Sequence, residues 1–318
     1  MGIGGVAYGS AGSDDESFKV FDRLLELGCT HWDTANVYGG SEDIIGKWFK
    51  RTGNRSKIFL ATKFGYTPSY SIDGSAEHVK KACAQSLASL NTDYIDLYYF
   101  HRVDTTTPIE ITVGAMAELV KEGKVKHIGL CEPSAATLRR AHAVHPIATI
   151  QVEYSPLFFE TEKNGVLDTA RELGVAVIAY SPLGRGLITG QYKSHSDLAP
   201  DDFRKVIPKF SESNFPTILA LSEKLKSIGH KYGENVTPGQ VALAWLLAQG
   251  DDILPIPGTK KISFTEENLG ACHLKLAQSD VQAIRDAMLA TEKNIPEDQA
   301  PEFMMKLNYQ DTPPLPVS

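Results

Sequence analysis

Short apolar runs alternate with amphipathic helical patterns along most of this sequence, and this alternation restricts the possible folds most strongly. The apolar runs recur at intervals of roughly 25–35 residues, which is typical of parallel strands joined by right-handed helical crossovers. The runs are almost continuously apolar, so the strands should be buried on both faces. Seven strands are predicted, at residues 29–33, 57–63, 94–100, 125–130, 149–154, 175–180 and 252–256.

Helical periodicity, capping residues and helix-ending glycines predict the elements between these strands. The predicted helices cover residues 16–27, 41–51, 75–90, 108–122, 134–143, 162–173, 216–232, 237–248, 265–270 and 279–290. Residues 184–214 carry no clear pattern and predict a long loop. The tail from residue 292 is rich in proline and is predicted to be irregular.

Two architectures fit this alternation, a (β/α)8 barrel and a doubly wound sheet. No Gly-x-Gly-x-x-Gly joins a strand to a helix, so the doubly wound dinucleotide fold lacks its fingerprint. Polar or special residues instead follow the ends of successive strands, as on the catalytic face of a barrel. We therefore predict a single TIM-barrel domain over residues 1–318, with its active face near Asp33, Lys63, His101, Cys131, Gln151, Tyr180 and Gly258.

Charge and composition narrow the functional class. The chain has 32 Lys and Arg against 39 Asp and Glu, a net charge of −7. This balance gives no electrostatic case for binding nucleic acid or an anionic membrane. No uncharged apolar run approaches the roughly 18–20 residues that span a bilayer, and the N-terminus lacks the basic and apolar parts of a signal peptide. The four cysteines are far apart in sequence, which indicates reduced thiols in a cytoplasmic protein.

Asp33, Tyr38, Lys63 and His101 have the chemistry of a proton donor. A free tyrosine has a pKa of about 10 and is a poor acid at neutral pH. A buried lysine ammonium beside the phenol would lower that pKa, and Asp33 could supply the counter-ion that the lysine needs. His101 could orient a carbonyl oxygen. Together these groups suit protonation of a carbonyl oxygen while hydride reaches the carbon.

Each of these residues also has an ordinary explanation. Asp33 could cap a turn, Tyr38 could be a packing aromatic, and His101 could be a buried histidine with its hydrogen bonds satisfied. Lys63 is more unusual, because a strand buried on both faces rarely ends in an unpaired lysine. Their occurrence on three successive strand ends favours the catalytic interpretation.

These segments resemble the aldo-keto reductases, and the resemblance covers most of the chain in the correct order. Within the family, the variants are similar to the branch of pyridoxal-reductase-like and broad-specificity aldehyde reductases. The segments that carry the resemblance are Asp33-Thr-Ala-Asn-Val-Tyr38-Gly, Phe59-Leu-Ala-Thr-Lys63-Phe-Gly65, Asp93-Tyr-Ile-Asp-Leu-Tyr-Tyr-Phe-His101, Gln151-Val-Glu-Tyr-Ser-Pro156, Ala179-Tyr-Ser-Pro-Leu-Gly-Arg-Gly186, Ile256-Pro-Gly-Thr259 and Glu267-Asn268.

The resemblance implies a (β/α)8 barrel that transfers hydride from NADPH to the carbonyl of an aldehyde or ketone. It implies that Tyr38 is the general acid/base, that Lys63 and Asp33 tune it, and that His101 orients the substrate. No metal is implied.

The resemblance also assigns a cofactor site. Tyr180 would stack on the nicotinamide and Gln151 would bind its carboxamide. Ser181, Leu183 and Arg185 would contact the pyrophosphate and its loop. The 2′-phosphate and ribose would be bound by Gly258, Thr259 and Lys260. The adenine would lie beside Glu267 and Asn268.

The sequence departs from the family pattern in two places that affect the expected cofactor site and the expected barrel. Phe264 stands where many relatives have an arginine that binds the 2′-phosphate, and Lys260 could compensate for it. Relatives also have a strand ahead of the segment matched by Met1-Gly-Ile-Gly-Gly. We therefore expect the first barrel strand to be missing or truncated, either because the protein starts upstream or because the barrel is incomplete.

Other functions remain open at this stage. An aldolase or isomerase on the same barrel would use Lys63 as a Schiff base but leave Tyr38 and Asp33 without a role. A cofactor-binding regulatory protein or an inactive relative is the main alternative to a reductase. The carbonyl substrate itself should be selected by loops 66–74 and 184–214 and by the tail, with Tyr66 and Tyr70 among the possible pocket walls.

Overall fold

The computed structural model describes residues 2–5, 12–296 and 301–316, with the side chains of residues 303 and 304 left aside. All seven predicted strands are present in these residues, and they form one sheet in the order β1 to β7. Strands β1 to β5 pair in parallel with their neighbours along the chain. The bounds are β1 His31–Asp33, β2 Phe59–Phe64, β3 Ile95–Phe100, β4 Val125–Cys131, β5 Thr149–Glu153, β6 Ala176–Tyr180 and β7 Ile253–Pro255.

Ten of the α-helices lie where helical periodicity predicts them. Their bounds are α1 Asp14–Glu26, α2 Ser41–Thr52, α3 Ala76–Ser89, α4 Ile109–Lys121, α5 Ala135–Val144, α6 Val166–Leu173, α7 Phe215–Gly229, α8 Pro238–Leu247, α9 Ile262–Gly270 and α10 Gln278–Asn294, and a short α11 covers Glu302–Met305.

Three predictions need correction. Helix α6 begins at Val166 rather than at residue 162, because Gly165 has a left-handed φ of 79° that interrupts the helix. The stretch 184–214 is not featureless and holds four 3-10 turns, at Gly184–Gly186, His195–Asp197, Phe203–Val206 and Pro208–Phe210. The tail, predicted to be irregular from residue 292, is helical in two places, since α10 continues to Asn294 and α11 covers Glu302–Met305.

The start of the chain, where we expect the first barrel strand to be missing or truncated, falls partly outside the described residues. Residues 2–5 form a turn closed by a 3.1 Å hydrogen bond from Gly5 N–H to the Gly2 carbonyl. Residues 6–11 lie outside the described residues. The seven strands therefore begin with β1 at His31.

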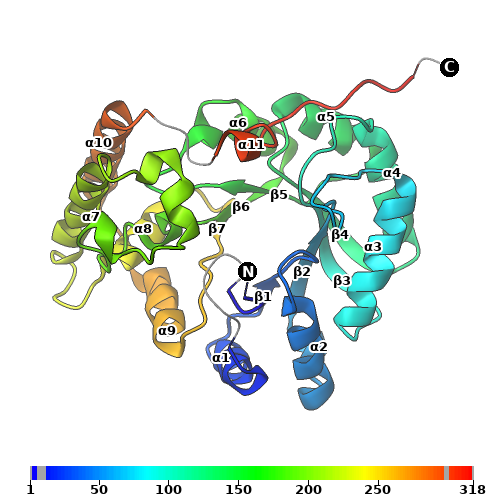
Figure 1. Cartoon of the computed structure of the whole chain (residues 1–318), viewed down its shortest axis with the longest axis horizontal. Coiled ribbons are helices and arrows are strands. Elements are labelled where there is room, and N and C mark those ends of the chain that lie inside the picture. The colour runs from blue at the N-terminus through cyan, green and yellow to red at the C-terminus, as the bar shows by residue number, and fades with distance from the viewer. Residues whose placement is uncertain (1, 6–11, 297–300, 317–318) are drawn as a thin grey trace. The chain divides into compact units, whose positions relative to one another are not determined.

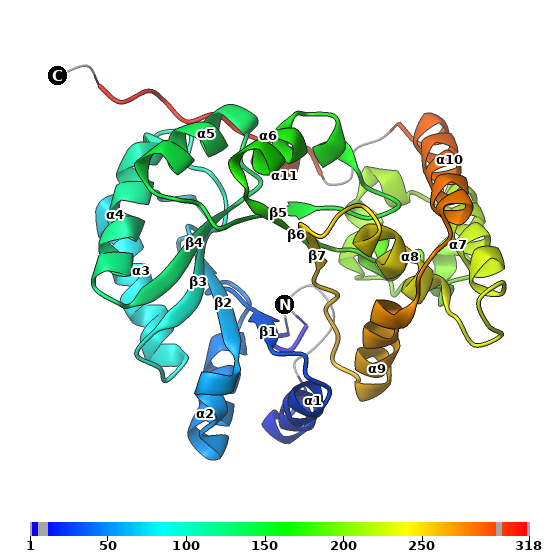
Figure 2. The ribbon, with the colours of Figure 1, turned by 180° about the vertical axis from the view of Figure 1, so that it is seen from behind.

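Backbone contacts divide the chain into two compact units. The first contains Met1–Gln151, Asn164–Val177 and Leu307–Ser318, and the second contains Val152–Lys163 and Ile178–Lys306. In the first unit, helices α2 to α5 lie along the outer side of strands β1 to β4, as Figures 1 and 2 show from opposite sides. This is the packing that the predicted crossovers require.

Aromatic side chains fill the core of the first unit. Phe64 stacks on Tyr98 and Phe100, with ring centroids 4.8 and 5.1 Å apart. Tyr98 and Tyr99 are completely buried on consecutive positions of β3, so both faces of that strand are covered. The strand therefore has the two-sided burial that its apolar sequence predicts.

In the second unit, ion pairs tie α10 to the segments around it. Arg285 donates to Glu162 at 2.6 Å and lies 4.8 Å from the Trp245 ring centroid on α8. Near the start of α10, Asp280 accepts from Tyr232 at 2.7 Å. These contacts fix the N-terminal half of α10.

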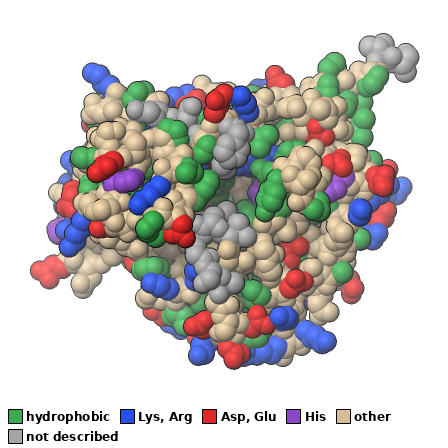
Figure 3. Space-filling view, viewed as in Figure 1, with side chains coloured by type: hydrophobic (Ala, Val, Ile, Leu, Met, Phe, Trp, Pro, Cys, Tyr) green, Lys and Arg blue, Asp and Glu red, His purple; other side chains and the backbone are tan. Residues whose placement is uncertain are grey.

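The exposed surface carries charges of both signs. Acidic and basic side chains are interspersed on the face in Figure 3 rather than gathered by sign. Among the described residues, no helix combines the length and apolar character needed to cross a membrane. The four cysteines form no disulfide with one another.

We expect Asp96 to be a main contributor to stability in the first unit. Its buried carboxylate accepts from Leu60 N–H at 3.0 Å, Arg55 at 2.8 Å and Lys126 at 2.8 Å. Asp96→Ala would leave the largely buried Arg55 without its carboxylate, which should lower the free energy of unfolding by about 3–5 kcal/mol. Urea unfolding measures this loss.

Lys126→Ala is the matched control. The Lys126 side chain is 52% exposed, so its removal should cost less than about 1 kcal/mol. Burial raises the pKa of Asp96, but the hydrogen bonds from Leu60, Lys126 and Arg55 outweigh burial and hold it below its usual value. The stabilisation should therefore be complete above the unfolded-state pKa of about 3.9 and disappear as the pH falls through the folded-state pKa. An effect of Asp96→Ala that is unchanged at pH 2 would contradict this assignment.

Candidate active site

The loop between β1 and α2 places Asp33 and Tyr38. Asp33 is the last residue of β1, and the loop is closed by a 2.6 Å hydrogen bond between the hydroxyls of Thr34 and Ser41. The Ser41 N–H also donates to the Tyr38 carbonyl at 3.3 Å. Gly4 also packs against this carbonyl, where a Cβ would lie only 1.6 Å from the oxygen. The carbonyl of Tyr38 is thus held by two neighbouring segments.

Lys63 forms the centre of the site. It lies near the end of β2, its side chain is completely buried, and its ammonium pairs with the Asp33 carboxylate. The ammonium also donates to the Thr34 carbonyl at 2.8 Å. The second oxygen of Asp33 accepts from the Gln151 amide at 2.8 Å, from the end of β5. Three strand ends, those of β1, β2 and β5, therefore meet in one hydrogen-bonded group.

The charge of Lys63 is maintained by its partners. Burial disfavours the ammonium, but Asp33 and Tyr38 outweigh burial and raise the pKa of Lys63 above its ordinary value. Lys63 is therefore a cation at neutral pH. Its nitrogen lies 4.9 Å from the centroid of the Tyr38 ring.

The pKa of Tyr38 differs from the sequence-based expectation. Lys63 does lower the pKa of the phenol, as predicted, but burial of the phenol raises it by more. The pKa of Tyr38 is therefore above, not below, that of a free tyrosine. The hydroxyl is protonated at neutral pH, which is the form that a proton donor needs.

His101 lies beside Tyr38, immediately after β3. The centroids of the two rings are 5.6 Å apart, and the rings meet in a T shape at 81°. The backbone N–H of His101 donates to the Phe64 carbonyl at 2.7 Å. Burial, Lys63 and Arg102 together hold the pKa of His101 well below its usual range. The imidazole is therefore neutral, so it has one N–H to donate and one nitrogen that accepts.

Cys131 ends β4 close to these groups and is an inert thiol. Burial raises its pKa to about 12, with only partial compensation from Lys63 and Arg102. A thiol with this pKa holds almost no thiolate at neutral pH, so it is a poor nucleophile.

In the second unit, the residues after β6 form a strained turn. Tyr180 ends β6, and Ser181 and Arg185 then adopt positive φ values of 50° and 55°. Gly184 and Gly186 also have positive φ within the same turn. Several left-handed residues in one short turn are typical of ligand-binding loops, where the surrounding structure sustains the strain.

Two arginines hold this turn in place. Arg185 pairs with the buried carboxylate of Glu153 at 3.2 Å. The Arg185 carbonyl accepts from Arg204 at 2.9 Å, and Arg204 is itself held by Asp202 at 2.6 Å and Tyr192 at 2.7 Å. The predicted pyrophosphate loop is thus fixed from both its side-chain and its backbone face.

Residues 258–261 precede the first turn of α9. Gly258, Lys260 and Lys261 are exposed there, and the Thr259 hydroxyl accepts from the Lys261 N–H at 3.0 Å. Hydroxyls, lysines and the N-terminus of a helix suit a phosphate group. The residue types and the strained turn after β6 therefore fit a dinucleotide.

Glu267 has a visible structural role in the same unit. Its carboxylate accepts from the Thr237 hydroxyl at 2.7 Å, and its carbonyl accepts from the Gln240 amide at 3.0 Å. These bonds tie α9 to the N-terminus of α8. Asn268 follows it on α9 and is half-buried.

The site can be divided by unit. In the first unit, the predicted residues Asp33, Lys63, Tyr38, His101 and Gln151 come together. In the second unit, Tyr180, Ser181, Leu183 and Arg185 share the turn after β6, whereas Gly258, Thr259, Lys260, Glu267 and Asn268 lie before and within α9.

Sequence reasoning missed four residues that support these groups. They are Thr34, whose carbonyl holds Lys63, and Glu153, Arg204 and Arg102. Arg102 had a signal in the sequence, since it directly follows His101 at a strand end. The others depend on contacts between distant segments.

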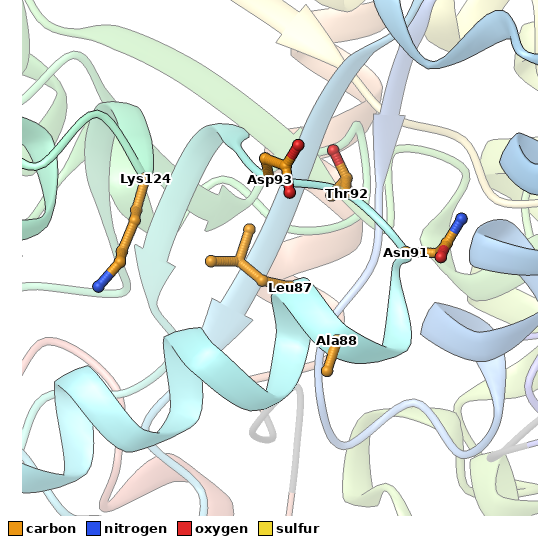
Figure 4. A pocket seen from close by; sticks show the side chains of 6 residues that line it. All are labelled: Leu87, Ala88, Asn91, Thr92, Asp93 and Lys124. Carbon is orange, nitrogen blue, oxygen red and sulfur yellow. The ribbon is translucent and has the colours of Figure 1, made fainter.

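The pocket in Figure 4 is not part of this site. It is a surface pocket of the first unit, lined by residues at the end of α3, in the loop that leads into β3, and before β4. The catalytic candidates follow the opposite, carboxyl ends of the strands. Its lining residues are Leu87, Ala88, Asn91, Thr92, Asp93 and Lys124.

A protonated phenol, a charged lysine and a neutral histidine lie together beyond the carboxyl ends of β1 to β3, on a fold of the (β/α)8 class. A model of the aldo/keto reductase family matches residues 1–288. The chain is 59% identical over 311 residues to aldo-keto reductase str7 of Strobilurus tenacellus, covering 97% of this chain and 90% of that protein. It is 45% identical over 318 residues to the NADP(+) aldo-keto reductase yakc of Schizosaccharomyces pombe, covering 97% and 92%.

Solved structures agree with this assignment. A glycerol dehydrogenase from Gluconobacter oxydans superposes with a TM-score of 0.82 at 28% identity, covering 95% of this chain and 92% of that one. A thermostable aldo-keto reductase gives a TM-score of 0.73 at 28% identity, covering 90% and 92%. The chain belongs to the aldo/keto reductase family, whose members are oxidoreductases that transfer hydride between NADP(H) and carbonyl groups.

We expect Asp33→Asn to lower the pKa of Lys63, because burial would then act on the ammonium without its carboxylate. NMR of isotope-labelled lysine, followed against pH, measures this change, and Lys63→Met assigns the signal. Asp14→Asn is the control, since Asp14 pairs with the exposed Lys47 at 2.7 Å. A Lys63 signal that titrates as in the wild type would show that Asp33 does not maintain the charge.

Proposed function

We propose that this protein reduces the carbonyl group of an aldehyde or ketone to an alcohol with NADPH, and that Tyr38 donates the proton. One observation carries the proposal. A charged, completely buried Lys63, paired with Asp33, lies 4.9 Å from the ring of a protonated Tyr38. A lysine in this position stabilises the phenolate that forms when the tyrosine gives up its proton.

NADPH supplies the hydride that reaches the carbonyl carbon. Neutral His101 donates an N–H to the carbonyl oxygen and orients it beside Tyr38. Negative charge develops on this oxygen, and Tyr38 passes its proton there. The buried ammonium of Lys63 offsets the cost of the resulting phenolate, and Asp33 keeps that ammonium charged before and after the transfer.

The same charge argues against Schiff-base chemistry. An amine attacks a carbonyl only in its neutral form, and the partners of Lys63 raise its pKa. An aldolase would need the opposite shift. The reductase assignment also gives Tyr38 and Asp33 a role, which the aldolase assignment does not.

The proposed cofactor contacts follow the two units. Gln151 of the first unit binds the carboxamide. In the second unit, Tyr180 stacks on the nicotinamide, and Ser181, Leu183 and Arg185 hold the pyrophosphate. The nucleotide end of the cofactor is held by Gly258, Thr259 and Lys260 at the 2′-phosphate and ribose and by Glu267 and Asn268 at the adenine.

We further propose that aldehydes are the main substrates and that the protein works in the cytoplasm. Unhindered aldehydes are intrinsically better hydride acceptors than ketones. Four cysteines without a disulfide are compatible with a reducing compartment.

Tyr38→Phe should lower kcat by roughly 10²–10⁴, the usual contribution of a positioned acid, while NADPH binding stays near that of the wild type. NADPH oxidation with 4-nitrobenzaldehyde, followed by absorbance, measures the rate. Tyr66→Phe is the matched control, because it removes the hydroxyl of a neighbouring tyrosine, whose ring lies 5.2 Å from that of His101 and which is not the proposed proton donor. A Tyr38→Phe enzyme with the wild-type rate would refute the assignment.

The same assay tests whether the protein is an enzyme. A wild-type protein that binds NADPH but turns over neither 4-nitrobenzaldehyde nor pyridoxal would instead support a cofactor-binding regulatory or inactive role.

Lys260→Ala should weaken NADPH binding by roughly tenfold, since it removes a charged hydrogen bond to the 2′-phosphate, and should affect NADH binding much less. Fluorescence titration with both cofactors measures the difference. Lys261→Ala is the control, because that ammonium lies 5.1 Å from the centroid of the Phe264 ring. Equal losses for NADPH and NADH would remove Lys260 from the phosphate site.

A further inference from the structure

Arg102 places a positive charge beside His101 of the candidate active site. It directly follows His101 and is half-buried, and its guanidinium donates to the His101 carbonyl at 2.8 Å. This bond folds the side chain back along the end of β3. The reduction mechanism above uses Tyr38, Lys63 and His101 but leaves Arg102 without a role.

The charge of Arg102 acts on three groups of the candidate active site. It lowers the pKa of Tyr38, of Tyr66 and of His101. At Tyr66 it exerts the largest charge effect, second only to burial among all causes. The hydrogen bond to the His101 carbonyl places the guanidinium next to His101, whose ring lies 5.2 Å from that of Tyr66 and 5.6 Å from that of Tyr38.

Lys63 does not offer its charge to a substrate in the same way. Its ammonium is completely buried and engaged by Asp33 and the Thr34 carbonyl. The remaining oxygen of Asp33 is taken by Gln151. In the first unit, the positive charge that acts at Tyr66 is therefore that of Arg102 and not that of Lys63.

Two tyrosine rings lie next to His101 on the loop after β2. Tyr66 packs edge-on against His101 at 5.2 Å, and Tyr70 packs against Tyr66 at 6.5 Å. The Tyr70 side chain is largely exposed, whereas Tyr66 is half-buried. The two tyrosines thus lead from the surface towards His101, and they would pack against a flat, apolar body.

We propose that Arg102 is a specificity residue that selects aldehydes carrying an anionic group, with an aromatic body between the aldehyde and the anion. This inference rests on the proposed function, because it places the aldehyde at Tyr38 and His101. The planar guanidinium pairs with a carboxylate through two parallel N–H bonds, and it stays charged at every relevant pH. The aromatic body packs on Tyr66 and Tyr70.

The test compares 4-formylbenzoate with its neutral methyl ester, which keeps the same aldehyde and ring. The readout is the ratio of kcat/KM for the acid to kcat/KM for the ester. This ratio cancels any general effect of Arg102 on the proton transfer. The wild type should favour the acid, and Arg102→Gln should lower the ratio roughly 10–100-fold, as expected for the loss of a charge-assisted pair.

Arg102→Lys separates charge from geometry. It keeps the positive charge but loses the planar fork, so its ratio should fall between those of the wild type and Arg102→Gln. Added salt should lower the wild-type ratio and have little effect on that of Arg102→Gln. A merely structural role for Arg102 would change the rates for acid and ester together and leave the ratio in place.

A binding measurement distinguishes this inference from the proposed function. Calorimetry with the product 4-(hydroxymethyl)benzoate and its methyl ester, on protein loaded with NADP+, needs no turnover. If Arg102→Gln loses binding of the acid but not of the ester, the anion site is supported, whether or not the protein is a reductase. If the wild type then shows no reductase activity, the reductase proposal alone is refuted. A wild type without preference for the acid, or a ratio unchanged in Arg102→Gln, would overturn the role of Arg102.

Discussion

The buried ion pair of Lys63 with Asp33 is the interaction on which the first unit's site depends. A completely buried ammonium is costly unless its charge and its hydrogen bonds are satisfied. Here the carboxylate of Asp33 and the Thr34 carbonyl satisfy it, and Gln151 satisfies the carboxylate in turn. The ends of β1, β2 and β5 must therefore be held in fixed relative positions for the pair to exist. A parallel sheet, whose strand ends all face one edge, provides this.

The second unit depends on a different feature, the backbone strain in the turn after β6 that is predicted to bind the pyrophosphate. Positive φ values at Ser181 and Arg185 cost energy that other contacts must offset. Glu153 holds the Arg185 side chain and Arg204 holds its carbonyl. Arg204 belongs to the 184–214 stretch, so part of that long segment serves as a support for the turn. This explains why 3-10 turns occur where no periodic pattern predicts structure.

Much of this arrangement could be predicted from the sequence. The seven strands and most helix positions followed from apolar periodicity and from capping residues, because these signals are local. The grouping of Asp33, Lys63 and His101 followed from their positions at strand ends. The sequence pattern starts this helix at residue 162 although α6 begins at Val166, because periodicity does not reveal the left-handed φ of Gly165. Glu153 and Arg204 could not be assigned, since their partners are distant in the chain.

The sequence by itself determined the order of elements and the family resemblance, and it singled out Tyr38 as the proposed proton donor, because motifs and periodicity are written in consecutive residues. Only the tertiary structure decided the protonation states. Burial and charge act through space, so the raised pKa of Tyr38 and the neutral state of His101 depend on what surrounds them. For the same reason, Arg102 is an ordinary residue in the sequence, and the fold sets its charge against His101, Tyr38 and Tyr66.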